Sequence, residues 1–163
     1  MFGWLYEVTL ETVIYRWGFS NRGVLFGPYC PVYGVGAFAF LFAINPLLRN
    51  KPWKKRLLLL PVVYVLSALL ATAIELATSY LCEFAIGYIP WDYTGYKYNF
   101  QARIALSTSL RFGLGGLIFL YLLQPLFEKM NAKLSDRTRT VIFSVILGLF
   151  LLDIVVHLAQ LLF

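Results

Sequence analysis

Long runs of apolar side chains constrain this chain more than any other feature of its sequence. Four stretches, at about residues 32–48, 57–88, 104–127 and 141–163, meet or approach the roughly 20 apolar residues that a helix needs to cross a bilayer. A fifth, at about residues 2–17, is short and carries two carboxylates. With 60% hydrophobic and 13% charged residues, the composition lies outside the range of soluble domains. We therefore expect an all-α, polytopic integral membrane helix bundle of about five transmembrane helices, forming a single transmembrane domain over residues 1–163.

The basic residues indicate how the helices are oriented. Nine of the 14 Lys and Arg residues lie in two short loops, at about residues 49–56 and 129–139. Because basic loops stay on the cytoplasmic side, the sequence predicts a multi-pass protein of the cell (cytoplasmic) membrane with its N-terminus inside and its C-terminus outside. Basic residues in an apolar chain usually meet lipid headgroups, so the net charge of +6 predicts the lipid bilayer rather than nucleic acid as a partner.

Two polar segments fall together on the predicted outer side. They are NRGVLFGPYCPVYGVGAF, at residues 21–38, and IPWDYTGYKYNF, at residues 89–100. Their prolines and glycines interrupt helices, and non-helical backbone at membrane depth is tolerated only where protein buries it or where it lines a cavity. We therefore expect non-helical outer loops folded against the bundle. Gly34 and Gly36 would give the following helix a smooth face for tight packing.

Ionisable side chains within the apolar stretches are candidate functional groups, because each is costly to place in lipid. Glu7 and Glu11 are four residues apart and share a helix face, and Glu75 lies ~27 Å along the third helix, near the outer edge of the hydrocarbon. Arg103, Ser107 and Arg111 would share a face of the fourth helix, with Glu75 or Glu11 as the natural partner of Arg111. The candidate ligand-binding residues are Glu7, Glu11, Arg22, Tyr29, Tyr33, Glu75, Glu83, Asp92, Tyr93, Asn99 and Arg111.

Other polar residues have simpler interpretations. The same acids and arginines could form an ion-pair network that only locks the helices together. Asp153 and His157 indicate an ordinary hydrogen bond, with a metal or proton-relay role as the alternative. Cys30 and Cys82 are too few and too far apart to form a metal site, and we expect neither a metal nor a cofactor. The nucleotide-binding P-loop and the common hydrolase motifs are missing from the sequence, which identifies no catalytic residue.

Four segments together resemble a known family. They are GWLYEV (residues 3–8), NRGVLFGPYCPVYGVGA (21–37), ELATSYLCE (75–83) and WDYTGYKYNFQARIALSTSLRFGLGG (91–116). The combination resembles the bacterial membrane family named Putative ABC-transporter type IV, also described as CmpB-like ABC transporter permeases. The resemblance implies transport. A chain of five helices without an ATPase would then need a separate ATPase subunit and a second membrane copy, as a homo-oligomer, to enclose a pathway.

The sequence leaves three functions open. The first is a transporter permease, or its substrate-binding membrane subunit, with an outward-facing acidic and aromatic pocket for an unknown small ligand. The second is an intramembrane enzyme acting on lipid or isoprenoid headgroups, with Glu75 or Glu83 as general base and Arg22 or Arg111 as phosphate clamp. The third is a structural partner protein. The sequence favours the first of these over catalysis.

Overall fold

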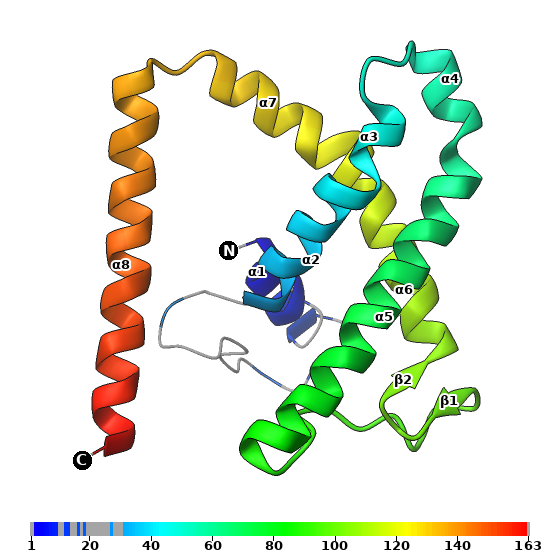
Figure 1. The fold of residues 1–163 in the computed structure, drawn as a ribbon, viewed down its shortest axis with the longest axis vertical. Helices are drawn as coiled ribbons and strands as arrows, with labels where there is room; N and C mark the ends of the chain where they lie inside the picture. Colours follow the sequence, from blue (N-terminus) through cyan, green and yellow to red (C-terminus); the bar gives the residue numbers. More distant parts are fainter. Residues whose placement is uncertain are drawn as a thin grey trace. The chain divides into compact units, whose positions relative to one another are not determined.

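The chain is mostly helical in the computed structural model, which describes residues 2–9, 12–13, 16, 18, 27 and 31–162 (Figure 1). Its elements are α1 (Phe2–Thr9), α2 (Pro31–Ala43), α3 (Asn45–Leu48), α4 (Trp53–Leu58), α5 (Leu60–Ile86), β1 (Asn99–Phe100), β2 (Ile104–Ala105), α6 (Leu106–Ile118), the π-helical turn η2 (Phe119–Leu123), α7 (Gln124–Ala132) and α8 (Asp136–Leu162). They fall into two compact units, one of residues 1–35 and 128–163 and the other of residues 36–127. That the whole chain forms one domain stays a prediction.

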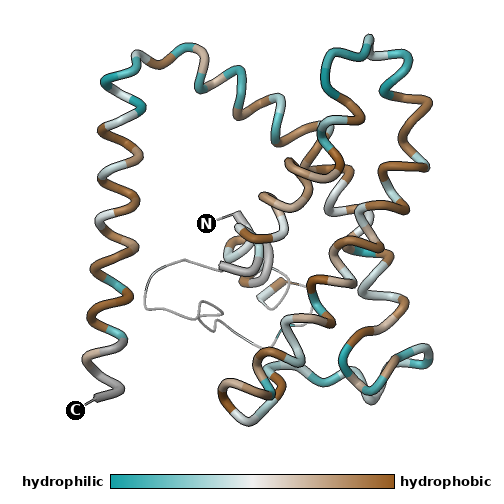
Figure 2. The backbone as a smooth tube through the Cα atoms, in the orientation of Figure 1, coloured by the Kyte–Doolittle hydropathy of each residue, from teal (hydrophilic) through white to brown (hydrophobic). Residues whose placement is uncertain are grey.

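Among the described residues, three helices are long and apolar enough to cross a membrane. They cover Leu60–Ile86, Leu106–Ala132 and Asp136–His157, with mean hydropathies of 2.0, 1.5 and 2.4, and their apolar residues are brown in Figure 2. Tyr33–Ala43 is a shorter apolar helix. The expectation of about five spans is therefore not confirmed by the described residues. A helix was expected over residues 2–17, but α1 ends at Thr9. Arg16 has a φ of 56°, so this residue is not helical.

Prolines explain where the helices break. Pro46 and Pro61 have no N–H and cannot donate a hydrogen bond to the carbonyl four residues earlier. The chain accordingly leaves regular helix at Ile44 and at Leu59. Pro125 has the same effect on the carbonyl of Tyr121. There the helix widens into η2, and the N–H of Gln124 donates to the carbonyl of Phe119, five residues back. The expected helix at residues 32–48 is thus two pieces, α2 and α3.

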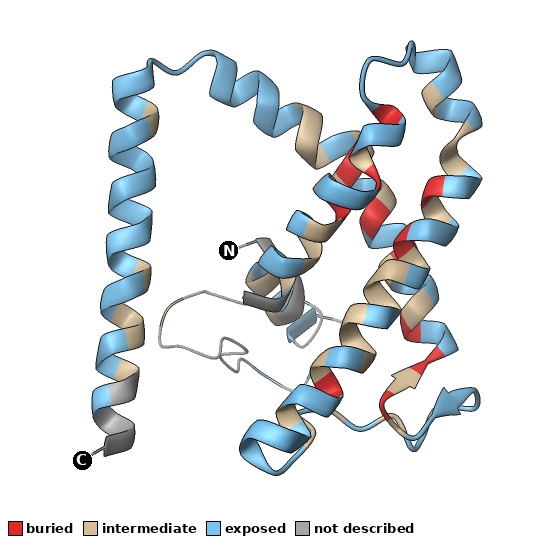
Figure 3. Cartoon of the chain, in the orientation of Figure 1, coloured by how far each residue is buried: buried red, intermediate tan, exposed pale blue. Residues whose placement is uncertain are grey.

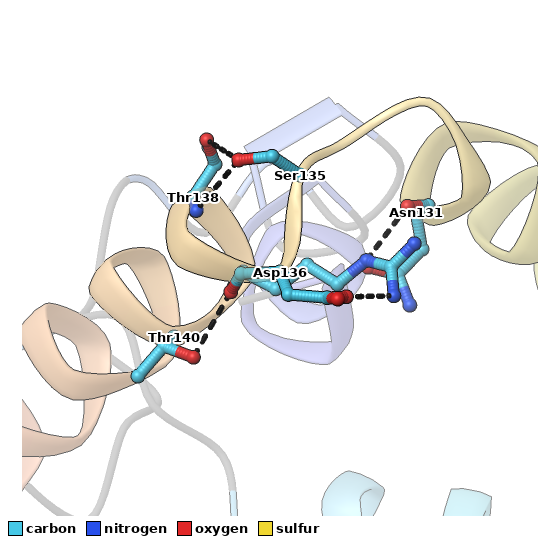
Figure 4. Close-up of polar contacts among 6 residues, drawn as sticks. Asn131, Ser135, Asp136, Thr138 and Thr140 are labelled. Carbon is cyan, nitrogen blue, oxygen red and sulfur yellow. Dashed lines mark hydrogen bonds and ion pairs between the residues drawn. The ribbon is translucent and has the colours of Figure 1, made fainter.

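Two expected helix starts were wrong. The fourth helix begins at Leu106 rather than at residue 104, because Ile104 and Ala105 pair with the antiparallel strand β1. The fifth begins at Asp136 rather than at residue 141. Ser135 Oγ accepts a hydrogen bond from the N–H of Thr138 at 3.1 Å and so caps the start of α8 (Figure 4). The polar residues at this end therefore belong to the helix rather than to the preceding loop.

The core lies within the unit of residues 36–127, where α5 packs against α6. Buried residues occur on α2, α3, α5, α6 and η2 (Figure 3), and the apolar cluster comprises Phe40, Ile44, Leu48, Val63 and Leu120. Close approach depends on glycine. A Cβ at Gly113 would lie 2.9 Å from a ring carbon of Tyr64, and one at Gly116 would overlap the side chain of Ser67.

The tight packing expected at Gly34 and Gly36 is not found in the described part of the chain. A Cβ built at either residue would have open space around it. Gly3 is different, because a Cβ on this residue of α1 would overlap the ring of Tyr33. Among the described glycines, close contacts of a helix therefore occur at Gly3, Gly113 and Gly116.

Candidate functional site

A polar cluster covers the C-terminal end of α5. It joins side chains of that helix to the segment between α5 and α6, and it lies wholly within the unit of residues 36–127. The residues of this polar cluster are Glu75, Ser79, Tyr80, Glu83, Trp91, Tyr93, Tyr96 and Arg103.

The segment that covers α5 is held by its own backbone. The helix ends at Gly87, which has a φ of 78°, and the chain then forms the β1–β2 hairpin. The N–H of Tyr93 donates to the carbonyl of Ala102 at 3.0 Å, and the N–H of Leu106 donates to that of Tyr98 at 2.8 Å. These bonds fix the position of Tyr93 and of the hairpin loop relative to the first turn of α6.

The hairpin loop delivers Arg103 to α5. Its guanidinium forms an ion pair with Glu83 through Nη2, and Nη1 lies 3.4 Å from the hydroxyl of Ser79. The guanidinium carbon lies 4.1 Å from the centroid of the Tyr80 ring. The indole N–H of Trp91 donates to the backbone carbonyl of Arg103 at 2.8 Å. With 8% of its surface exposed, Arg103 is a buried cation that is paired and stacked.

Glu75 lies on the same side of α5 as Ser79 and Glu83, because these residues are four positions apart. The hydroxyl of Tyr93 donates to Glu75 Oε1 at 2.7 Å. Burial raises the pKa of Tyr93 above its usual range, and the neighbouring Glu75 raises it further, so this phenol remains a donor at neutral pH. The other carboxyl oxygen, Oε2, is buried and has no hydrogen-bond partner among the described residues.

Two predicted site residues stabilise the segment itself. Asn99 Oδ1 accepts from the N–H of Ala102 at 3.1 Å, and its Nδ2 donates to the carbonyl of Tyr96 at 2.8 Å. Asp92 accepts hydrogen bonds from the N–H and the hydroxyl of Thr94 at 2.8 and 3.0 Å. Both side chains are exposed and satisfied locally, as turn-forming Asn and Asp residues usually are.

Arg111 does not pair with Glu75. Its side chain is exposed, and Tyr93 is the partner that the structure gives to Glu75. The expected helix face of Arg103, Ser107 and Arg111 was also wrong, because Arg103 precedes α6 and belongs to the hairpin. Sequence reasoning missed that role for Arg103, together with the contributions of Trp91 and Tyr80. Asp92 and Asn99, the two turn-forming residues in WDYTGYKYNF, indicate that the chain does not enter the helix before Arg103.

The remaining candidates lie in the N-terminal part of the chain. Glu11, Arg22 and Tyr29 lie outside the described residues, as do Cys30 and the side chain of Glu7. The pairing of Arg111 with Glu11 therefore stays a prediction. Tyr33 is half-buried beside Gly3. Cys82 is a free, half-buried thiol.

Asp153 contacts the first polar segment. Its Oδ2 accepts a hydrogen bond from the N–H of Gly27 at 2.7 Å, within the unit of residues 1–35 and 128–163. This carboxylate of α8 therefore binds the backbone of the glycine- and proline-rich segment at Gly27. Among the described residues, no three His, Cys, Asp or Glu side chains come together as they would to hold a metal ion.

Comparison with known proteins agrees with the membrane character of this fold. The family described as Putative ABC-transporter type IV matches residues 1–158, nearly the whole chain. No curated protein and no solved structure matches the chain. With its apolar helices and a match of this extent, the chain belongs to the Putative ABC-transporter type IV family of membrane proteins.

Proposed function

We propose that this chain is the membrane subunit of a transporter and that the polar cluster on α5 binds its small ligand on the outer side of the membrane. The observation that carries the proposal is the buried Oε2 of Glu75, which has no partner among the described residues. Buried polar atoms are almost always satisfied, so an orphaned carboxyl oxygen marks a place for a further group. Arg103 and Glu83 neutralise each other's charge through Nη2, as locking residues do, although the buried Nε of Arg103 has no partner among the described residues.

Membership of this family supports transport as the function. Members of a family named for ABC transport work in the membrane, and this sequence contains no nucleotide-binding P-loop. A separate ATPase subunit would then supply the energy. A second copy of the chain would help to enclose the pathway, because three to five helices are few for a channel through the bilayer.

The proposed topology has five membrane segments, with α1 and the α2–α3 pair added to the three long helices. The basic residues around α4 and around the junction of α7 and α8 are cytoplasmic under this proposal, so the N-terminus is inside and the C-terminus is outside. Glu7, Glu11, Arg22, Tyr29, Tyr33 and Arg111 remain proposed contributors to the ligand site.

Thermal unfolding in detergent tests the proposal. Wild type, Glu75→Gln and Arg111→Gln are each heated with and without a lipid and metabolite extract of the cell. We expect the extract to raise the unfolding temperature of wild type, because a ligand that binds only the folded state stabilises it. Glu75→Gln should stay folded and lose that response, since an amide replaces the orphaned carboxyl oxygen.

Asp136→Asn is the matched control. It also removes one carboxylate, from an exposed ion pair with Arg139 at the start of α8 (2.9 Å), and should keep the full response to the extract. Mass spectrometry of the stabilised wild type then identifies the ligand. If wild type gains nothing from any extract while Glu75→Gln and Arg111→Gln lose stability, the acids and arginines only lock the helices and the proposal is wrong.

A further inference from the structure

Glu75 has no positively charged partner among the described residues of the polar cluster and its loop. Arg103 pairs with Glu83, and the exposed Asp92 is satisfied by Thr94. The ammonium of Lys97 lies 5.4 Å from the centroid of the Tyr98 ring, on the exposed part of the loop. Glu75 is therefore the one carboxylate of α5 and this segment that is half-buried and has a hydroxyl, rather than a cation or solvent, as its described partner.

Tyr93 contacts this carboxylate through its hydroxyl, and a second ring packs against that of Tyr93. The rings of Tyr93 and Tyr96 meet edge to face with their centroids 5.2 Å apart, and both residues are half-buried. The hydroxyl of Tyr93 donates to Oε1, which leaves Oε2 as the free acceptor. A half-buried carboxylate whose second oxygen is buried and free suits an ammonium group, because the ammonium can donate a charge-assisted hydrogen bond to that oxygen.

We infer that the ligand of this site is a small organic cation whose ammonium group donates a hydrogen bond to Oε2 of Glu75 beside Tyr93. The inference rests on the proposed function and adds the chemical class of the ligand. The cation would supply the positively charged partner that Glu75 lacks among the described residues. Glu83 already neutralises the charge of Arg103, so an anionic ligand at that guanidinium would compete with Glu83, even though its Nε has no partner among the described residues.

Three probes of matched size and different charge test the inference. They are n-butylammonium, butyramide and butyrate, each added at the same millimolar concentration to the full chain in detergent, with the unfolding temperature as readout. We expect n-butylammonium to stabilise wild type and the two other probes to leave it unchanged. Glu75→Gln should weaken n-butylammonium binding by roughly tenfold or more, because it removes a charge-assisted hydrogen bond. Asp136→Asn should bind it as wild type does.

The comparison among probes needs no variant, so the test holds even if Glu75→Gln does not fold. Stabilisation by butyrate or butyramide in preference to n-butylammonium would overturn the inference. So would stabilisation by n-butylammonium that is equal in wild type and Glu75→Gln. If the cell extract stabilises wild type but n-butylammonium does not, the ligand is not a simple ammonium cation and the proposed function survives. If neither has any effect, both proposals fail.

Discussion

Two residues in the hairpin loop, Gln101 and Ala102, hold backbone angles that L-amino acids rarely adopt. Their φ angles are 52° and 56°, and the N–H of Arg103 closes the turn by donating to the carbonyl of Phe100 at 3.0 Å. Turns of this kind favour Asn and Gly at both central positions, since a side chain costs ~1–2 kcal/mol in the left-handed region. The strain coincides with the point where Arg103 turns towards α5, as expected if the loop is kept for the placement of that side chain.

Ala102→Gly should therefore stabilise the protein, because glycine adopts the left-handed conformation without strain. We expect a gain of ~0.5–1 kcal/mol, measured as a higher unfolding temperature in detergent. Ala105→Gly is the matched control. Ala105 is buried and has a φ of −138°, so the same substitution there should lower the unfolding temperature. A loss of stability in Ala102→Gly would show that the loop is not strained as described.

The individual residues of the site were predicted better than their contacts. The sequence singled out Glu75, Glu83 and Tyr93 because they are polar groups in or beside an apolar stretch, and the structure places all three in the polar cluster. The partner of each acid could not be read from helical spacing. Glu83 pairs with Arg103 of the hairpin loop, and Glu75 pairs with Tyr93 of the segment before the hairpin. Strands of two residues leave almost no periodic signal in the sequence.

At the scale of elements, small residues set the distance between α5 and α6. Gly113 and Gly116 lie against Tyr64, Ser67 and Ala68, so the two backbones approach closely, as they do in membrane helix pairs. The hydroxyl of Thr72 donates to that of Ser109 at 2.7 Å across the same interface. This interface supports the polar cluster, because α5 provides its carboxylates and α6 continues from its hairpin.

Gly116→Ala should disturb this interface. The new methyl group would overlap Ser67, and we expect a loss of ~1–3 kcal/mol, as for other overpacked contacts, seen as a lower unfolding temperature. Gly115→Ala is the control on the same helix. It meets open space, so it should be neutral or slightly stabilising. Adding Ser67→Gly to Gly116→Ala should restore part of the loss. Equal effects of Gly115→Ala and Gly116→Ala would contradict this packing.

Local chemistry marks two helix starts that the apolar stretches alone misplaced. Pro61 near the start of α5 and Ser135 before α8 are signals of helix starts, and both elements begin there. The start of α6 and the break at η2 depend on the hairpin and on a helix that widens rather than ends at Pro125. Both outcomes reflect contacts or backbone adjustments that hydrophobic periodicity does not report.

At the scale of the whole molecule, the surface of the long helices identifies the solvent as lipid. On α8, large apolar residues such as Phe143, Leu149 and Val155 are exposed, at 64%, 54% and 62% of their surfaces. A helix that is apolar all round is stable only within protein or hydrocarbon. The sequence predicted this membrane character from composition and length alone. It did not establish five spans, because α1 and α2 are shorter than the bilayer is thick.

Cysteine labelling shows on which side of the membrane the polar cluster lies. In a chain carrying Cys30→Ser and Cys82→Ser, Thr94→Cys reports on the exposed loop of the cluster and Lys51→Cys on the exposed basic loop before α4. The account predicts that a membrane-impermeant maleimide labels Thr94→Cys in intact cells and labels Lys51→Cys only after permeabilisation. Labelling of Lys51→Cys in intact cells, with Thr94→Cys protected, would place the cluster on the cytoplasmic side and contradict an outward-facing ligand site.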